Sequence, residues 1–102
     1  MFLSGHSNPK ARLLSGTKVS RQKDKWLLTT VLTNHSRYPA FNIRLKVLGD
    51  KSRKRILPVM YDDNYFTLLP GEQKMVTMEL QNADTRGEQP VVAIEGFNLE
   101  KY

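Results

Sequence analysis

The sequence predicts an all-β domain, an antiparallel β-sandwich of about seven strands. Short runs rich in β-branched and aromatic residues alternate with turn residues, and no helical apolar period extends beyond a turn. The chain has 102 residues, 39% of them hydrophobic and 25% charged, which is enough for one core and too little for two. We therefore expect a single domain over residues 11–102, preceded by a disordered or linker segment at residues 1–10.

The clearest strand covers residues 40–48, where apolar and polar residues alternate. A period of two places every second side chain on the same face of a strand. Such a strand fits an antiparallel sheet that is packed on one face and exposed to water on the other. The side chains predicted to face the core are Phe41, Ile43, Leu45 and Val47.

Two further strands are predicted before and after this one. Residues 26–33 contain aromatic and β-branched residues without Gly or Pro. The polar residues 34–39 that follow end in a proline and suit a link across the sandwich better than a tight hairpin. Residues 73–80 follow a Leu-Pro-Gly-Glu turn at 69–72. In this strand the residues predicted to face inward are Val76, Met78 and Leu80.

The remaining strands are predicted at residues 13–22, 55–60, 65–68 and 91–96. The chain has no cysteine, so no disulfide and no thiolate metal site can form. The expected fold is therefore an immunoglobulin-like or fibronectin-like sandwich that is held by apolar burial alone.

The net charge of +6 raises the question of a polyanionic partner. The densest basic run follows Gly49 and Asp50, where a solvated hairpin loop is expected. Weak, salt-sensitive polyanion binding stays an alternative, but no aromatic residues are interleaved with the basic ones. We expect no nucleic-acid partner, and no membrane partner, because no apolar stretch approaches a membrane span. The residues concerned are Lys46, Lys51, Arg53, Lys54 and Arg55.

Few residues could carry chemistry. Asp62 and Asp63 are adjacent, so on a strand they would point to opposite faces, and in a turn they would accept backbone N–H groups. His6 and His35 do not stand at metal-ligand spacing. We predict no catalytic residue, no metal site and no cofactor.

Two isolated signals have ordinary structural explanations. Asn34-His35-Ser36 matches the N-glycosylation pattern, which occurs often by chance, and we expect it to be unused. Trp26 could stack on a sugar or a base, but its position at the start of an apolar strand favours a role in the core.

The most unusual segment is residues 57–66, which combines three aromatic residues with two carboxylates. Aromatic anchors with polar neighbours are typical of recognition surfaces. The structural alternative is that Tyr61 and Phe66 point inward while the polar residues between them form a turn; both can hold. The candidate recognition residues are Tyr61, Asp62, Asp63, Asn64 and Tyr65.

Residues 56–72 read Ile-Leu-Pro-Val-Met-Tyr-Asp-Asp-Asn-Tyr-Phe-Thr-Leu-Leu-Pro-Gly-Glu, and residues 92–98 read Val-Ala-Ile-Glu-Gly-Phe-Asn. Together they resemble the C-terminal immunoglobulin-like domain of family 2 glycoside hydrolases, in the β-mannosidase and exo-β-D-glucosaminidase branch. Leu-Thr-Asn at 32–34 and Tyr-Pro-Ala-Phe at 38–41 are similar to a loop between two strands of that domain. The resemblance covers roughly residues 11–98.

This resemblance implies an accessory sandwich that is not itself an enzyme. In such enzymes the acid and nucleophile are glutamates of a central barrel, and no residue here corresponds to them. The implied partners are the catalytic barrel and other domains of a longer parent chain, the implied location is periplasmic or secreted, and the segment from Tyr61 to Tyr65 is the candidate cleft-facing loop.

A stand-alone carbohydrate-binding or adhesion module is the alternative. A carbohydrate-binding module would require an exposed aromatic platform built from Trp26, Tyr38 or Tyr65.

Overall fold

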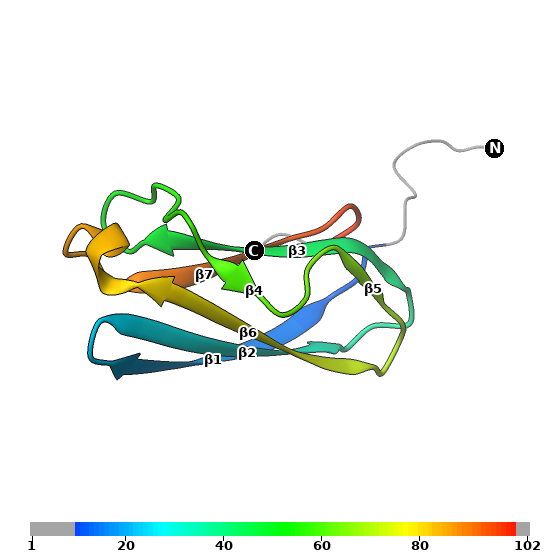
Figure 1. Cartoon of the computed structure of the whole chain (residues 1–102). Helices are drawn as coiled ribbons and strands as arrows, with labels where there is room; N and C mark the ends of the chain where they lie inside the picture. The colour runs from blue at the N-terminus through cyan, green and yellow to red at the C-terminus, as the bar shows by residue number, and fades with distance from the viewer. Residues whose placement is uncertain (1–9, 100–102) are drawn as a thin grey trace.

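The computed structural model describes residues 10–99, so all but Lys10 of the predicted linker lies outside the described residues. Two antiparallel sheets are stacked face to face, which confirms the predicted β-sandwich (Figure 1). One sheet has the strand order β1-β2-β6-β4 and the other β5-β3-β7. The strands are β1 (Leu13–Gln22), β2 (Lys25–Asn34), β3 (Ala40–Gly49), β4 (Met60–Tyr61), β5 (Phe66–Leu68), β6 (Gln73–Gln81) and β7 (Pro90–Glu95).

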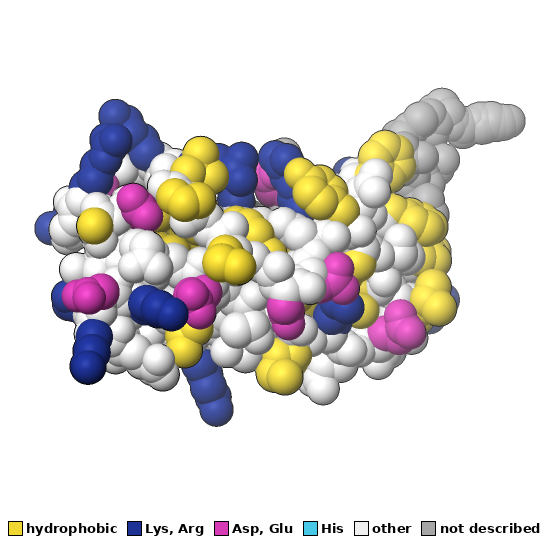
Figure 2. Space-filling model, viewed as in Figure 1, with side chains coloured by type: hydrophobic (Ala, Val, Ile, Leu, Met, Phe, Trp, Pro, Cys, Tyr) yellow, Lys and Arg dark blue, Asp and Glu magenta, His cyan; other side chains and the backbone are white. Residues whose placement is uncertain are grey.

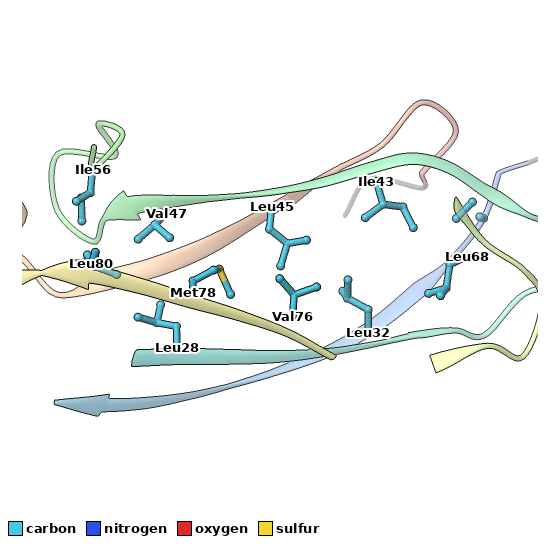
Figure 3. Close-up of a cluster of buried hydrophobic side chains, with 12 residues drawn as sticks. Leu28, Leu32, Ile43, Leu45, Val47, Ile56, Leu68, Val76, Met78 and Leu80 are labelled. Atoms are coloured by element: carbon cyan, nitrogen blue, oxygen red, sulfur yellow. The ribbon is translucent and has the colours of Figure 1, made fainter. Parts of the chain in front are cut away.

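The core lies between the two sheets and is supplied mainly by β2, β3 and β6 (Figure 3). The inward set predicted for β6 is confirmed, because its three members are at most 2% exposed. On β2, Leu28 and Thr30 lie directly opposite Met78 and Val76 of β6, so the two strands bury neighbouring side chains on the same face of the sheet. The labelled core residues are Leu28, Leu32, Ile43, Leu45, Val47, Ile56, Leu68, Val76, Met78 and Leu80.

Two connections between strands follow from their turn residues. Residues 35–39 carry the chain from β2 in one sheet to β3 in the other, which confirms the predicted crossing. Before β6, Gly71 has a φ of 80°, and the N–H of Glu72 donates to the carbonyl of Leu69 at 2.9 Å. Proline followed by a left-handed glycine is the pattern of a type II turn.

The inward prediction for Phe41 is wrong, because its side chain is 45% exposed. Asn42 adopts a φ of 52°, and the register of β3 against β5 shifts between Ala40 and Ile43. This bulge inserts one extra residue, so Ala40 takes the inward place in front of Ile43. The other three predicted side chains, Ile43, Leu45 and Val47, are buried as expected.

The strand predicted at residues 55–60 is also wrong in extent. Arg55 makes only an isolated bridge to Leu48, and β4 begins at Met60. Pro58 lies between them and has no N–H to give to a ladder. A single helical element, the 3-10 turn η2 (Asn82–Thr85), lies among residues 10–99, and no helix there is long and apolar enough to cross a membrane.

Candidate functional site

The candidate segment joins β4 to β5 and so passes from one sheet to the other. Tyr65 is 66% exposed, and Asp62 and Asp63 are exposed as well. Tyr61 instead packs against the core, and its hydroxyl is buried without a hydrogen-bond partner. The segment therefore combines the two predicted arrangements: Tyr61 and Phe66 turn inward, whereas Tyr65 faces solvent.

Both carboxylates of the segment are engaged by the fold itself. Asp62 accepts from the N–H of Thr77 at 2.9 Å and donates its own N–H to the Thr77 carbonyl at 3.1 Å. Asp63 Oδ2 lies 2.6 Å from Lys74 Nζ, and its Oδ1 accepts from the N–H of Asn64. The hydrogen bond from Lys74 lowers the pKa of Asp63, so this group is an anion and a poor proton donor.

Asn64 closes the edge of β3 where β5 has already ended. Its Oδ1 accepts from the N–H of Leu45 at 2.8 Å, and its Nδ2 donates to the Leu45 carbonyl at 3.1 Å. One side-chain amide thus pairs with both backbone groups of a strand residue, as a neighbouring strand would. Its function is structural.

Tyr65 stands next to a group of charges on the outer face of β3 and β7. Arg44 donates to the Tyr65 hydroxyl at 3.3 Å and to Glu95 Oε1 at 2.7 Å. Lys46 Nζ lies 2.7 Å from Glu95 Oε2. The hydrogen bonds from Lys46 and then Arg44 lower the pKa of Glu95. A shallow hollow of about 360 Å³ is lined by Asn42, Arg44, Tyr65, Glu95 and Gly96.

This hollow offers an exposed aromatic ring and fixed hydrogen-bond donors, which is chemistry for binding rather than for bond cleavage. Its single carboxylate is held between two cations. Among residues 10–99, no group of three or more His, Asp or Glu side chains could hold a metal ion. The arrangement can therefore contact a polar partner, but it has no pair of carboxylates for acid and base.

Trp26, which was also considered as a ring for stacking on a sugar, is held by contacts within the domain. Its indole N–H donates to Asn82 Oδ1 at 3.0 Å, and the guanidinium of Arg21 lies 5.4 Å from the ring centroid. The ring also packs against the core. Tyr38 is 39% exposed but lies in the link between β2 and β3.

The basic run after β3 lies in an exposed loop at residues 50–55, as Gly49 and Asp50 led us to expect (Figure 2). Glu88 holds this loop, because its Oε1 accepts from the N–H groups of Lys51 and Ser52 at 2.9 and 2.7 Å. These bonds, that of Ser52 first, lower the pKa of Glu88. Lys46 is turned away from the loop toward Glu95, so the five basic residues do not act as one cluster.

Two asparagines with key structural roles were missed by the sequence analysis. Asn34 is 1% exposed, and its Nδ2 donates to the carbonyls of Tyr38 and Leu68 at 2.8 and 2.9 Å. Asn98 is 7% exposed and bonds to the carbonyl of Pro39 and the N–H of Phe41. The available signal was an amide side chain at the end of β2 and another in the turn after β7, where backbone groups lack strand partners.

Two stacked antiparallel sheets of this order, crossed by a link between the second and third strands, define an immunoglobulin-like sandwich domain. The chain belongs to the family described as the exo-β-D-glucosaminidase Ig-fold domain, which matches residues 9–99. This confirms the resemblance to that branch of the family 2 glycoside hydrolases.

Named relatives agree with this assignment. The chain is 41% identical over 100 residues to an exo-β-D-glucosaminidase of Amycolatopsis orientalis, covering 94% of this chain and 10% of that protein. It is 37% identical over 70 residues to an exo-β-D-glucosaminidase of Arthroderma benhamiae, covering 69% of this chain and 8% of that protein. A mannosylglycoprotein endo-β-mannosidase of Lilium longiflorum is 40% identical over 47 residues, covering 46% of this chain and 5% of that protein.

The crystal structure of the Amycolatopsis orientalis exo-chitosanase CsxA superposes with a TM-score of 0.82 at 31% identity. The match covers 88% of this chain and 11% of that one. The chain thus spans about a tenth of the length of these relatives.

Proposed function

We propose that this domain is a non-catalytic accessory sandwich of a longer glycosidase that cleaves β-D-glucosaminides. The observation that carries the proposal is the family match, which spans residues 9–99 and is supported by 41% identity to an exo-β-D-glucosaminidase. The engagement of Asp62 and Asp63 by Thr77 and Lys74 supports the absence of acid and base chemistry here. The partners are the other domains of the parent chain, including its catalytic barrel.

Within that enzyme, we assign the hollow beside Tyr65 to the border of the substrate cleft. Tyr65 offers an exposed ring of the kind that packs on the apolar face of a sugar, and Arg44 offers hydrogen-bond donors. Tyr61 takes no part in this contact, because it is packed against the core. Asp62, Asp63 and Asn64 hold the loop that presents Tyr65.

Hydrolysis assays test the accessory function directly. The chain and a longer polypeptide that contains it are each incubated with p-nitrophenyl β-D-glucosaminide and p-nitrophenyl β-mannoside. We expect release of p-nitrophenol only from the longer polypeptide and faster from the glucosaminide. Turnover by the 102-residue chain alone would contradict the proposal, whereas preference for the mannoside would move the parent enzyme to the other branch.

Substitution in the longer enzyme tests the cleft contact. Tyr65→Ala should raise the KM for glucosamine oligomers at least about fivefold, the loss of a moderate contact of ~1 kcal/mol. Met75→Ala is the matched control, because Met75 is 62% exposed but lies on the outer face of the other sheet. Equal kinetics for both variants would remove Tyr65 from the cleft. Binding of chitosan oligomers by the isolated chain would instead favour the carbohydrate-binding module.

A further inference from the structure

Two exposed phenylalanines adjoin the hollow beside Tyr65. Phe97 is 73% exposed and Phe41 is 45% exposed. The N–H of Phe97 donates to the carbonyl of Phe41 at 2.9 Å, so the turn after β7 lies beside the first residues of β3 (Figure 1). Asn42, the residue after Phe41, lines the hollow, and so does Gly96, the residue before Phe97. We call Phe41 and Phe97 the phenyl pair.

The backbone that carries the phenyl pair is held in place by the fold. Asn98 Oδ1 accepts from the N–H of Phe41 at 2.9 Å, and its Nδ2 donates to the carbonyl of Pro39 at 2.8 Å. A Cβ on Gly96 would lie 2.7 Å from the side chain of Leu99 and 3.3 Å from the carbonyl oxygen of Phe41. A glycine is therefore required for the turn to pack this closely against β3.

The exposure of Phe41 depends on the bulge in β3. With an uninterrupted period of two, its side chain would point to the core alongside that of Ile43. The left-handed conformation of Asn42, with a φ of 52°, interrupts this period. The fold thus gives up the burial of a large apolar side chain, which is otherwise favourable. Bulges that redirect a side chain are over-represented next to functional sites, which indicates a binding role for this ring.

The chemistry around the phenyl pair fits a protein surface better than a sugar. A phenyl ring has no polar atom, whereas tyrosine and tryptophan combine a ring with a hydrogen-bonding group. Aromatic residues and arginine are enriched in protein interfaces, with an apolar centre and a polar rim. In the adjoining hollow, Arg44 and Lys46 share the one carboxylate of Glu95, so this rim has an excess of positive charge. A complementary surface offers an apolar pocket with a carboxylate or carbonyl at its edge.

We propose that the phenyl pair docks into such a pocket on the catalytic domain of the same longer polypeptide, with the acceptor at the pocket's edge facing Arg44. The length of the relatives supports this occupant, because the chain covers only 10% of an exo-β-D-glucosaminidase to which it is 41% identical. The inference rests on the proposed function, which assigns the hollow beside Tyr65 to the border of the substrate cleft. A contact through the neighbouring phenyl pair places that hollow where the two domains meet.

Hydroxyl-radical footprinting read by mass spectrometry measures the exposure of these rings without any substrate. The 102-residue chain and the longer polypeptide are oxidised in parallel. We expect oxidation of Phe41 and Phe97 to be at least about tenfold slower in the longer polypeptide, because the centre of an interface is packed like a protein interior. Leu57 is the matched control: it is 61% exposed and lines a different hollow beside Gly49, at the other end of β3. Its oxidation rate should not change.

A substitution tests whether the two rings act together. In the longer polypeptide, Phe97→Ser should raise the oxidation rate of Phe41 about threefold or more, toward its rate in the chain alone. Leu57→Ser should leave the Phe41 rate unchanged. In the 102-residue chain, Phe97→Ser should leave the urea midpoint of unfolding unchanged, because the ring is exposed there. That measurement shows that the variant domain still folds.

Four results would overturn the proposal. The first is equal oxidation of the phenyl pair in the chain and in the longer polypeptide. The second is slowing of Leu57 as large as that of Phe97, which would mean that no particular face is covered. The third is slower oxidation of the pair in the chain alone when glucosamine oligomers are added, which would assign the rings to a sugar. The fourth is oxidation in the chain alone that slows as its concentration rises, which would assign them to a second copy.

The footprinting experiment and the hydrolysis assays fail separately. Footprinting contains no hydrolysis step, so equal oxidation of the phenyl pair leaves the glycosidase assays unaffected. A longer polypeptide that cleaves neither p-nitrophenyl substrate would refute the proposed activity, and its footprint would still report whether the phenyl pair is covered.

Discussion

The two long sides of β3 and its partners differ in how their backbone groups are satisfied. On the side of β5, the ladder ends early, but Asn64, Ile56 and Lys54 supply hydrogen bonds to Leu45, Val47 and Gly49. On the other side, β7 pairs fully with β3 and then presents an outer edge with no described partner. We call these the closed flank and the open flank.

Single side chains can therefore replace strand pairing one residue at a time. A strand residue needs one acceptor and one donor at its edge, and an asparagine side chain supplies both. The closed flank uses this substitution where β5 is only three residues long. On the open flank, by contrast, no strand among residues 10–99 pairs with the outer edge of β7.

Proline substitutions at neighbouring positions of β7 should give the largest difference in stability between the two edges of this strand. Val91→Pro removes an N–H that faces β3 and should destabilise the domain by about 3 kcal/mol or more. Val92→Pro removes an N–H that faces the open flank and should cost less than half as much. Urea unfolding followed by tryptophan fluorescence measures both. Equal losses would mean that the outer edge is already paired.

Removal of the Asn64 amide tests the closed flank. Asn64→Leu leaves the N–H and C=O of Leu45 without partners and should cost about 2–3 kcal/mol. Asp63→Ala, one residue earlier, removes an exposed ion pair to Lys74 and one exposed hydrogen bond from the Asn64 N–H, and should cost less than about 1 kcal/mol. Thermal unfolding of both variants gives the difference. A smaller loss in Asn64→Leu than in the control would contradict the role given to the amide.

A pair of valine-to-threonine changes compares the two flanks at the level of the core. Val47 and Val92 are directly opposite in the ladder, but Val47 is fully buried and Val92 only half-buried. Val47→Thr buries a hydroxyl and should cost about 1–2 kcal/mol, whereas Val92→Thr should cost about 0.5 kcal/mol because its hydroxyl reaches water at the open flank. Urea unfolding measures both losses of stability. A loss in Val92→Thr as large as that in Val47→Thr would contradict the prediction.

The smallest expected effect is electrostatic. Lys46 and Arg44 lower the pKa of Glu95, so its ion pairs stabilise the fold above the ordinary glutamate range, about pH 4, and this contribution disappears as pH falls through the lowered value. Glu95→Gln should therefore unfold at slightly lower urea than the original at neutral pH and at the same urea in acid. High salt should reduce the neutral difference, since the group is exposed. A difference that grew in acid would reverse the assigned sign.

Strands with an uninterrupted period could be predicted from the sequence, because burial follows the period of two. The period of β6 holds from Val76 to Leu80 and predicts its inward face. On β3 the alternation predicted the wrong face for Phe41, because the left-handed backbone of Asn42 shifts the inward and outward positions by one residue. An asparagine in the sequence does not by itself predict such a conformation. Around residues 55–60, the chain forms a loop instead of a strand because Pro58 has no N–H for a ladder.

The candidate loop could be found from its composition, but the orientation of each of its residues could not. Tyr65 is exposed beside Arg44, whereas Tyr61 packs inward and Asn64 serves β3. Which aromatic faces outward depends on contacts with β3 and β6, which lie far away in the sequence. The open flank could not be predicted either, since it follows from the order of strands in the two sheets.

The buried amide of Asn34 has a consequence for the timing of modification. Both of its hydrogens are donated within the fold, to Tyr38 and Leu68, and its oxygen accepts from Ser36, so the finished domain cannot present this nitrogen to a glycosyl-transferring enzyme. An oligosaccharide could be attached at Asn34 only on the unfolded chain, and once attached it would prevent the loop from closing. In a host that modifies nascent chains, sugar attachment and folding of this domain therefore compete for the same molecule.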